Sequence, residues 1–293
     1  MVYIKKSYTI YSVCFYEKLK SKGGGKMQLI STSMGFYYGG YYSVDYDLTV
    51  ASIDSSPYSY QAGINYDIQM SKANNRDVVN FYGVNKKLLE FDFQIFKTTV
   101  WTIEDRKDIM NIFFQNAFRD LYFADDDDSG DHYTNIIFNC MPNGKVEAID
   151  FGGMYGMSIP MICSTPYALT EEINQYFDLS TNTTTTDIEV RNYGNLQNEP
   201  YYNIEIDFTL VDAETDISLV NNNDSGRECA FTGLTATENI IINNYTKEIT
   251  SDTASSRISE FNKTWFRLVA GINTITVTGK CLIAFTARYP III

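Results

Sequence analysis

FNKTWFRLVAGINTITVTGKCLIAFTARYP, residues 261–290, is the stretch that decides the fold class. Around a Gly-Lys turn at residues 279–280, apolar residues alternate with others on both sides. Ile275 and Val277 alternate with threonines before the turn, and residues 281–289 continue the alternation after it. Period-two alternation with β-branched residues and a Gly-containing turn predicts an antiparallel hairpin. One face of each strand must then be buried, so a second sheet is implied and a β-sandwich is expected.

Length and composition agree with a mainly β protein. At 293 residues and 44% hydrophobic residues, the chain is long enough for two domains with cores of their own. The 23 Tyr and 18 Phe favour strands and contact surfaces. The net charge of −13 argues against a protein that grips nucleic-acid phosphates, although DNA could still slide past it without sticking.

The five cysteines are odd in number and widely spaced, and none forms a C-x-x-C pair. This usage predicts reduced thiols and assembly in a cytosol. The cysteines inside strand-like runs are expected to be small core residues, and they are Cys140, Cys163 and Cys281. No apolar run approaches the ~18 residues of a membrane helix, so no membrane insertion is expected.

Residues 1–26 differ from the rest of the chain. They contain six Lys and one Glu, and Lys-Gly-Gly-Gly-Lys stands directly before Met27. Codons for that run can spell a purine-rich ribosome-binding site. One hypothesis is therefore that Met27 is the true start and that residues 1–26 are an untranslated leader. The alternative is a flexible basic arm that contacts an acidic neighbour.

A first domain is expected over residues 27–168, built from strands and one helix. The helix is predicted over residues 102–118, with Thr102 as N-cap and Asp105 in the capping-box position. Its apolar face is expected from residues at helical spacing, which are Ile103, Met110, Phe113, Phe114 and Ala117. Residues 80–85 are expected to be a short turn-rich segment.

A second domain is expected over residues 169–293, with the boundary just after the Thr-Pro-Tyr step, near Ala168. Residues 169–190 form a polar bridge, and at least seven short strands follow, separated by Gly and Asn turns. Short strands at regular spacing predict a β-sandwich or jelly roll.

Several short motifs follow one another in a fixed order along residues 27–293. They are an aromatic Gly turn before Asp45-Tyr46-Asp47-Leu48, the step Thr165-Pro166-Tyr167, the opening Val190–Tyr201, the Gly-x-Asn at 271–273 and the closing Arg288-Tyr289. In this order the sequence resembles the distal tail proteins (Dit) of long-tailed bacteriophages.

The resemblance implies a ring-forming N-terminal β-domain with one helix, similar to a tail-tube domain, followed by a galectin-like β-sandwich. It implies a structural protein of the phage tail tip, without enzymatic activity. Six copies would form a ring that joins the tail tube protein to the tail-tip hub protein, with a channel for DNA. The ring would be a docking platform for receptor-binding or fibre proteins. The implied location is the virion tail tip, after assembly in the bacterial cytoplasm.

No constellation of residues predicts catalysis, a cofactor or a metal. His132 is the one histidine, and no nucleophile elbow accompanies it. The acidic run at residues 125–131 could offer oxygen ligands to Ca²⁺, but its twelfth position is Ile136 where an EF-hand has Glu. A solvated loop is the better interpretation. We therefore expect no catalytic, cofactor-binding or metal-binding residues, and no sequence-specific binding of nucleic acid.

Two other functions remain open from the sequence. A carbohydrate-binding module would contact the host surface through exposed aromatic residues, for which Trp265, Tyr245 and Tyr201 are the candidates, although strand aromatics more often lie in the core. A secreted hydrolase would need a carboxylate pair in a cleft, which spacing along the chain neither favours nor excludes.

Overall fold

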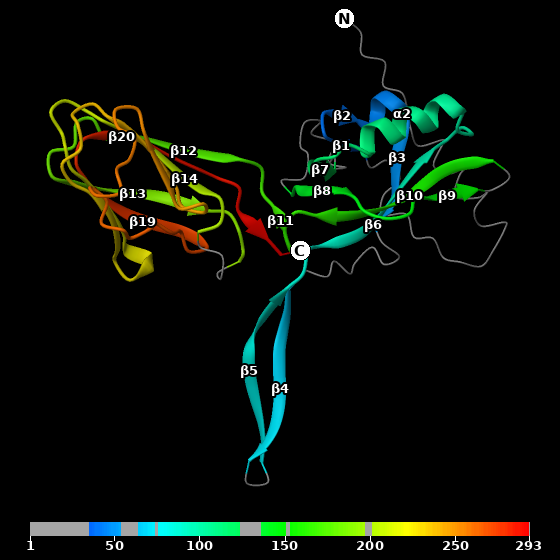
Figure 1. Ribbon diagram of the computed structural model, residues 1–293, viewed down its shortest axis with the longest axis horizontal. Coiled ribbons are helices and arrows are strands. Elements are labelled where there is room, and N and C mark those ends of the chain that lie inside the picture. Colours follow the sequence, from blue (N-terminus) through cyan, green and yellow to red (C-terminus); the bar gives the residue numbers. More distant parts are fainter. Residues whose placement is uncertain are drawn as a thin grey trace, which may run out of the picture. The chain divides into compact units, whose positions relative to one another are not determined.

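The computed structural model describes residues 35–53, 64–73, 76–123, 136–150, 153–196 and 201–292. The chain divides into two compact units, one up to Ala168 and the other from Leu169 to Ile292 (Figure 1). The hypotheses about Met27, residues 1–26, residues 125–131 and His132 fall outside the described residues.

The first unit is an eight-stranded antiparallel sheet covered on one face by a helix. The strands run in the order β2-β1-β7-β8-β10-β6-β3, and β9 pairs with β10 beside this path. Their bounds are β1 (Phe36–Tyr38), β2 (Tyr41–Tyr42), β3 (Leu48–Ile53), β6 (Glu90–Lys97), β7 (Arg119–Phe123), β8 (Phe138–Pro142), β9 (Glu147–Asp150) and β10 (Met154–Cys163). A short 3-10 turn, η1 (Ser43–Tyr46), links β2 to β3.

The helix α2 (Ile103–Phe113) begins where the sequence predicts. The Thr102 hydroxyl accepts from the Asp105 backbone amide at 3.1 Å, and the Asp105 carboxylate accepts from the Thr102 backbone amide at 2.7 Å. This capping box satisfies amides that have no partner inside the helix. Lys97 of β6 donates to the same carboxylate at 2.8 Å and ties the start of α2 to the sheet.

The predicted end of the helix is wrong, and its predicted apolar face is correct only at Phe113. The helix stops at Phe113, and the chain then leaves helical geometry at Phe114 so that residues 119–123 can pair with β1. The core contacts come from Ile109, Ile112 and Phe113. The expected face residues Ile103, Met110 and Phe114 are instead 64%, 39% and 41% exposed, and Ala117 is also exposed.

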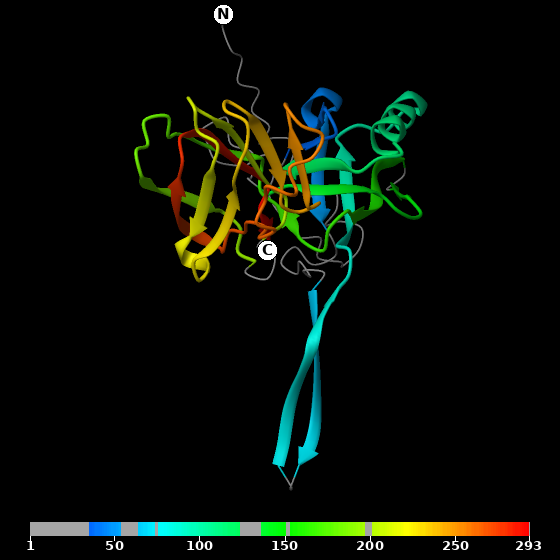
Figure 2. The ribbon, with the colours of Figure 1, turned by 60° about the vertical axis from the view of Figure 1, so that its left-hand side comes forward.

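A second sheet in this unit is the hairpin of β4 (Ile64–Ala73) and β5 (Arg76–Lys86). It is paired from Ile64 with Lys86 to Ala73 with Arg76, and it extends away from the larger sheet in both ribbon views (Figure 2). The expectation of a turn-rich segment at residues 80–85 is wrong, because pairing with β4 keeps this segment extended and a bulge takes up the extra residue.

The second unit is a sandwich of two antiparallel sheets. One sheet has the order β12-β20-β14-β17-β18 and the other β13-β19-β15-β16. Their bounds are β12 (Ile173–Asp178), β13 (Thr185–Asn192), β14 (Ile204–Leu210), β15 (Ile217–Asn221), β16 (Arg227–Phe231), β17 (Asn239–Asn243), β18 (Glu248–Ser251), β19 (Gly271–Thr278) and β20 (Cys281–Ala287). A 3-10 turn, η2 (Asn222–Asp224), follows β15, and the two short strands β11 (Ala168–Leu169) and β21 (Pro290–Ile291) pair with each other. The expectation of a mainly β fold is confirmed.

The strands predicted from residues 271–289 form, but the predicted hairpin is wrong. β19 pairs with β13 and β15, whereas β20 pairs with β12 and β14 in the opposite sheet. Residues 279–280 are thus a corner between sheets. Gly279 has a φ of +103°, and a Cβ there would lie 2.6 Å from the Asp216 carbonyl oxygen. The corner lets the apolar sides of β19 and β20 face each other across the core, among them Ile275, Val277, Ile283 and Phe285.

Buried polar groups tie the long segment between β18 and β19 to the sandwich. The Glu238 side chain is fully buried and accepts from Arg257 Nε at 2.7 Å and from the Thr235 amide at 2.8 Å. Asn273 accepts from Asn221 Nδ2 at 2.9 Å and donates to the Val269 carbonyl at 2.8 Å. Satisfied polar groups of this kind fix a single path for a loop.

Candidate functional site

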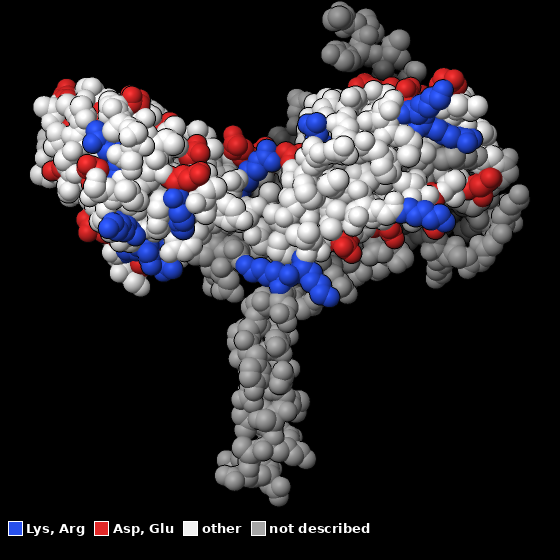
Figure 3. All heavy atoms as spheres, viewed as in Figure 1, with Lys and Arg blue, Asp and Glu red and all other residues white. Residues whose placement is uncertain are grey.

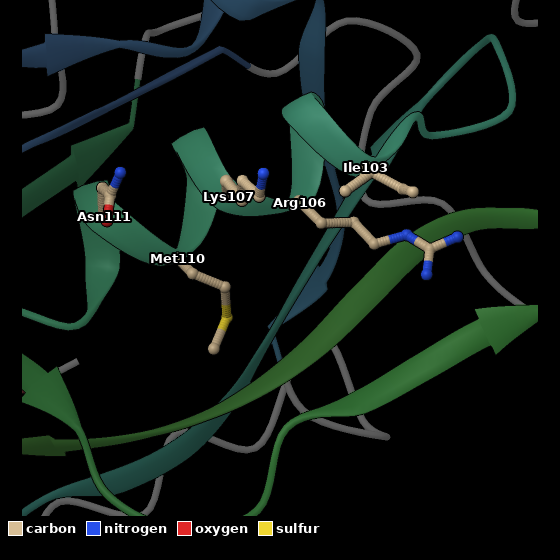
Figure 4. Close-up of a pocket in the computed structure, with 5 residues that line it drawn as sticks. All are labelled: Ile103, Arg106, Lys107, Met110 and Asn111. Carbon is tan, nitrogen blue, oxygen red and sulfur yellow. The ribbon is translucent and has the colours of Figure 1, made fainter.

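The outer side of α2 carries an exposed stripe of apolar and basic residues, here called the α2 stripe. Five side chains of the helix line a shallow hollow, and Figure 4 shows them projecting from the same side; they are Ile103, Arg106, Lys107, Met110 and Asn111. Positions three, four and seven apart fall on one helix face, which brings Ile103, Arg106, Lys107, Met110 and Phe114 together.

The charge of the α2 stripe is positive. Arg106 and Lys107 form no ion pair with any residue in the described part of the chain, whereas Asp105 is held by Lys97 and by the helix cap. The hydrogen bond from Lys97 is the main cause that lowers the pKa of Asp105 to about 2, and the bonds from Thr102 add to it. The Asp105 charge is thus already satisfied on the sheet side of the helix.

The opposite face of the large sheet lies away from α2 and is here called the open face. Tyr37 stacks on Tyr122 with centroids 4.4 Å apart, and its ring meets Tyr42 at 5.0 Å. These residues are cross-strand partners on β1, β7 and β2, so they form one ladder on one face. Tyr37 and Tyr122 are half-buried, and Tyr42 is 42% exposed.

The open face is acidic. Cross-strand pairing places Asp120 of β7 on the same face as the tyrosines, and it places Glu90 and Asp92 of β6 there too. No Lys or Arg stands at a position on this face of β1, β2, β6, β7, β8 or β10. The view in Figure 3 shows basic side chains in small separate groups with acidic groups between them, so no continuous basic surface appears on that side.

A cluster of aromatic and charged residues lies on the second unit. Lys247 sits in the turn between β17 and β18, with a φ of +64°, and its ammonium lies 3.7 Å from the Tyr201 ring centroid and 5.2 Å from that of Trp265. The guanidinium carbon of Arg267 lies 5.9 Å from the centroid of the same Tyr201 ring, and Arg267 binds Asp224 through two nitrogens. Cation–π contacts of this kind favour a charge at an aromatic surface.

The pKa values of the lysine and of the arginine in this cluster shift in opposite directions. Burial lowers the pKa of Lys247, and the nearby charge of Arg227 lowers it further. The hydrogen bond to Asp224 raises the pKa of Arg267, although burial opposes the shift. Asp224 also accepts from Arg227 Nε at 3.0 Å. One described carboxylate is therefore surrounded by two guanidinium groups, with Lys247 beside them.

The structure brings the three sequence-predicted sugar-binding candidates into one region. Tyr201 and Trp265 share Lys247, and Tyr245 packs on Tyr202 at 5.1 Å. Trp265 is partly buried against the core and Tyr245 is 56% exposed. Lys247 could not be predicted as part of this region from the sequence, because only folding of the β17–β18 turn brings it to Tyr201.

The described cysteines are free thiols buried in the two cores. Cys140, Cys163, Cys229 and Cys281 are free and buried, as expected for the three that the sequence placed in the core. Burial raises the pKa of the Cys140 thiol, and its partner Cys163 adds to the effect. Among the described residues no group of His, Cys, Asp and Glu has the arrangement of a metal site, and no helix there is long and apolar enough to cross a membrane.

Comparison with known protein families shows that two family models match this chain. Residues 31–165 match the family model of a phage tail protein N-terminal domain, and residues 167–287 match that of a phage tail C-terminal domain. No curated protein sequence matches the chain.

Nine chains of solved structures are similar to this chain, among them the following two. The Dit protein of phage SPP1, described as a paradigm of the hub adsorption apparatus in phages that infect Gram-positive bacteria, is 14% identical with a TM-score of 0.61. The match covers 87% of this chain and 99% of the SPP1 protein. A chain of the phage P2 baseplate in its activated conformation is 10% identical, with a TM-score of 0.46 and coverage of 88% and 99%. The resemblance to distal tail proteins is confirmed at the level of the fold, and the chain belongs to the phage tail proteins whose N-terminal and C-terminal domains these two family models describe.

Proposed function

We propose that this chain forms a ring at the phage tail tip, between the tail tube and the tail-tip hub. The observation that carries the proposal is the order of its two units: a β unit that carries helix α2 and then a β-sandwich, each matched to a phage tail domain. The similarity in fold to the SPP1 protein of a hub adsorption apparatus supports it. Six copies of 33.4 kDa would have a mass of about 200 kDa.

The two units would divide the work, with no chemical step. Residues 27–168 are proposed as the ring-forming domain, because its sheet and its helix both leave surfaces for neighbours. Residues 169–293 are proposed as the docking platform for receptor-binding or fibre proteins, since the closed sandwich is a self-sufficient support for exposed loops. Free, buried cysteines suit assembly in the host cytoplasm.

The ring would also serve as a channel for DNA. The chain carries a net charge of −13, so the walls of a channel built from it would repel phosphate and would not retain the passing strand. The proposed partners are other copies of the chain, the tube protein, the hub protein and the fibre proteins.

The test is the location and shape of the assembled protein. Antibodies against the purified chain are expected to label the tail tip of intact phage particles, and negative-stain images of the purified assembly are expected to show rings. Labelling along the tail shaft or on the head would contradict the proposal.

A second candidate function is carbohydrate binding by the sandwich. The grouping of Tyr201 and Trp265 around Lys247, with the exposed Tyr245 packed on the neighbouring Tyr202, favours it, because sugar rings pack on aromatic faces and their hydroxyls accept from cations. On a glycan array, the full chain is expected to bind and Tyr245→Ala to lose most of the signal. Equal array signals from the wild-type chain and Tyr245→Ala would show that sugars bind at a site other than Tyr245. No signal from the wild-type chain would contradict carbohydrate binding and leave the sandwich as a scaffold.

A further inference from the structure

The α2 stripe and the open face lie on opposite sides of the same domain. The ring of Phe113 joins α2 to the sheet, 4.7 Å from Tyr38 and 5.9 Å from Phe93. Successive residues of a strand point to opposite faces, so Tyr37 and Asp92, which precede these two residues, point away from the helix. One surface therefore looks outward from the helix layer and the other from the sheet layer.

The two surfaces have opposite charge and both expose apolar groups. The α2 stripe has Arg106 and Lys107 between Ile103 and Met110, and the open face has three carboxylates and no cation on the strands that form it. Apolar residues exposed singly need no explanation, but a group rimmed by charge is typical of a contact surface. Opposite potentials at two surfaces favour their association and fix their orientation.

The two carboxylates on β6 match the two cations of the stripe in spacing. Glu90 and Asp92 stand two residues apart on one face of the strand, which places them about 7 Å from each other. Arg106 and Lys107 are neighbours on α2, and their long side chains can reach both carboxylates.

We propose that the α2 stripe of one copy docks on the open face of a second copy. The contact joins two different surfaces, so every copy keeps one free stripe and one free face, and repetition produces a ring when the rotation closes. This inference rests on the proposed association of copies and names the surfaces that carry it. The cations of Arg106 and Lys107 pair with the carboxylates of Glu90 and Asp92.

Charge reversal on each side tests the contact in the full chain. The double variant Arg106→Glu, Lys107→Glu is expected to weaken self-association at least about tenfold in sedimentation velocity, because two attractive pairs become repulsive. The reciprocal variant Glu90→Lys, Asp92→Lys is expected to weaken it to a similar extent. A mixture of the two variants is expected to associate with near wild-type strength, since each reversed surface then meets its complement.

The control variant is Lys87→Glu, Lys263→Glu, which makes the same change in net charge as the α2 double variant on exposed residues outside both surfaces, Lys263 being in the second unit. It is expected to associate like the wild type. If the wild-type chain forms rings and both reversed variants do so equally well, the contact is wrong and the ring proposal stands. A wild-type chain that stays monomeric at every concentration would contradict the contact, while the tail-tip location keeps its own test. If the mixture of the two reversed variants associates as weakly as each variant alone, the pairing of the α2 stripe with the open face is also wrong.

Discussion

The two units of this protein bury the apolar faces of their β-sheets in different ways. In the second unit two sheets cover each other, and the inner residues of β14, β19 and β20 reach exposed fractions near zero. In the first unit one helix covers one face of one sheet, and the other face keeps half-buried tyrosines. The first unit thus leaves apolar and charged surface for a partner, whereas the second is complete by itself.

The largest effect is expected at helix α2, which covers one face of the first sheet. Phe113→Ala removes the ring that packs on Tyr38, Phe93 and Phe36, and large-to-small changes of buried aromatics cost about 3–5 kcal/mol. The two tryptophans report on different units, since Trp101 is buried in the first and Trp265 lies in the second. Urea unfolding in a Trp265→Phe background is expected to show a lowered midpoint for Trp101.

The same substitution in a Trp101→Phe background is expected to leave the transition of Trp265 near its original midpoint. A common shift in both transitions would mean that the two units unfold as one, and the comparison between an open and a closed unit would fail.

A somewhat smaller effect is expected at the buried ion pair of the second unit. Burial is the largest single influence on the pKa of Glu238 and would raise it. The hydrogen bonds from Arg257, Ser251, Thr235 and Thr253 together outweigh burial, and the pKa falls from 4.5 to about 2. Because the folded pKa is the lower one, the stabilisation is fully present above about pH 4.5 and is lost as the pH falls toward 2. Glu238→Gln leaves the Arg257 charge without its carboxylate and is expected to destabilise the sandwich by about 3 kcal/mol at pH 7.

Unfolding midpoints from Trp265 fluorescence at pH 7 and at pH 3 measure this effect. The difference between wild type and Glu238→Gln is expected to shrink at pH 3. The exposed Glu189 of β13 provides the matched control, and Glu189→Gln is expected to change the midpoint little at either pH. An equal loss at both values of pH would show that packing, and not the charge pair, makes the contribution.

The smallest effect on stability is expected at the α2 stripe. Ile103 is 64% exposed and Ile109, on the inner side of the same helix, is 2% exposed. Ile103→Ser is expected to change the free energy of unfolding by at most about 0.5 kcal/mol, whereas Ile109→Ser should cost several times more. Ile103→Ser is nevertheless expected to weaken self-association in sedimentation velocity, while a stable variant with unchanged association would remove Ile103 from the contact.

The sequence predicted what local rules determine and failed where distant strands decide. Alternation identified the strands around Ile275 and Ile283 correctly, but both a hairpin and a corner between sheets satisfy the same alternation, and only pairing with β13 and β12 distinguishes them. Thr102 and Asp105 fixed the start of the helix by chemistry within four residues. The end of the helix depends on the pairing of residues 119–123 with β1, and the residues near the helix end carry no signal of that pairing.

The helix face shows the same limit. The predicted face joined Phe113, which is buried, to Ile103 and Met110, which are exposed, and it left out the buried Ile109. Periodicity cannot tell which of these residues meet the sheet. The candidate site in the sandwich was predictable in part, because Trp265 and Tyr201 are conspicuous as residue types. Lys247 was not, since its turn must form before the side chain meets either ring.

The corner at Gly279 has a consequence for the synthesis of the chain. β19 and β20 are interior strands of the two sheets, so neither sheet of the sandwich can close before residues 271–287 have left the ribosome. β12 must wait for β20, as the bond from Asn174 to Thr286, 112 residues apart, illustrates. At roughly 5–20 residues per second this wait lasts on the order of 5–20 seconds. During that time the edges of the earlier strands stay unpaired. Unpaired edges are prone to aggregation, so the nascent chain needs protection by chaperones until β19 and β20 take their places in the two sheets.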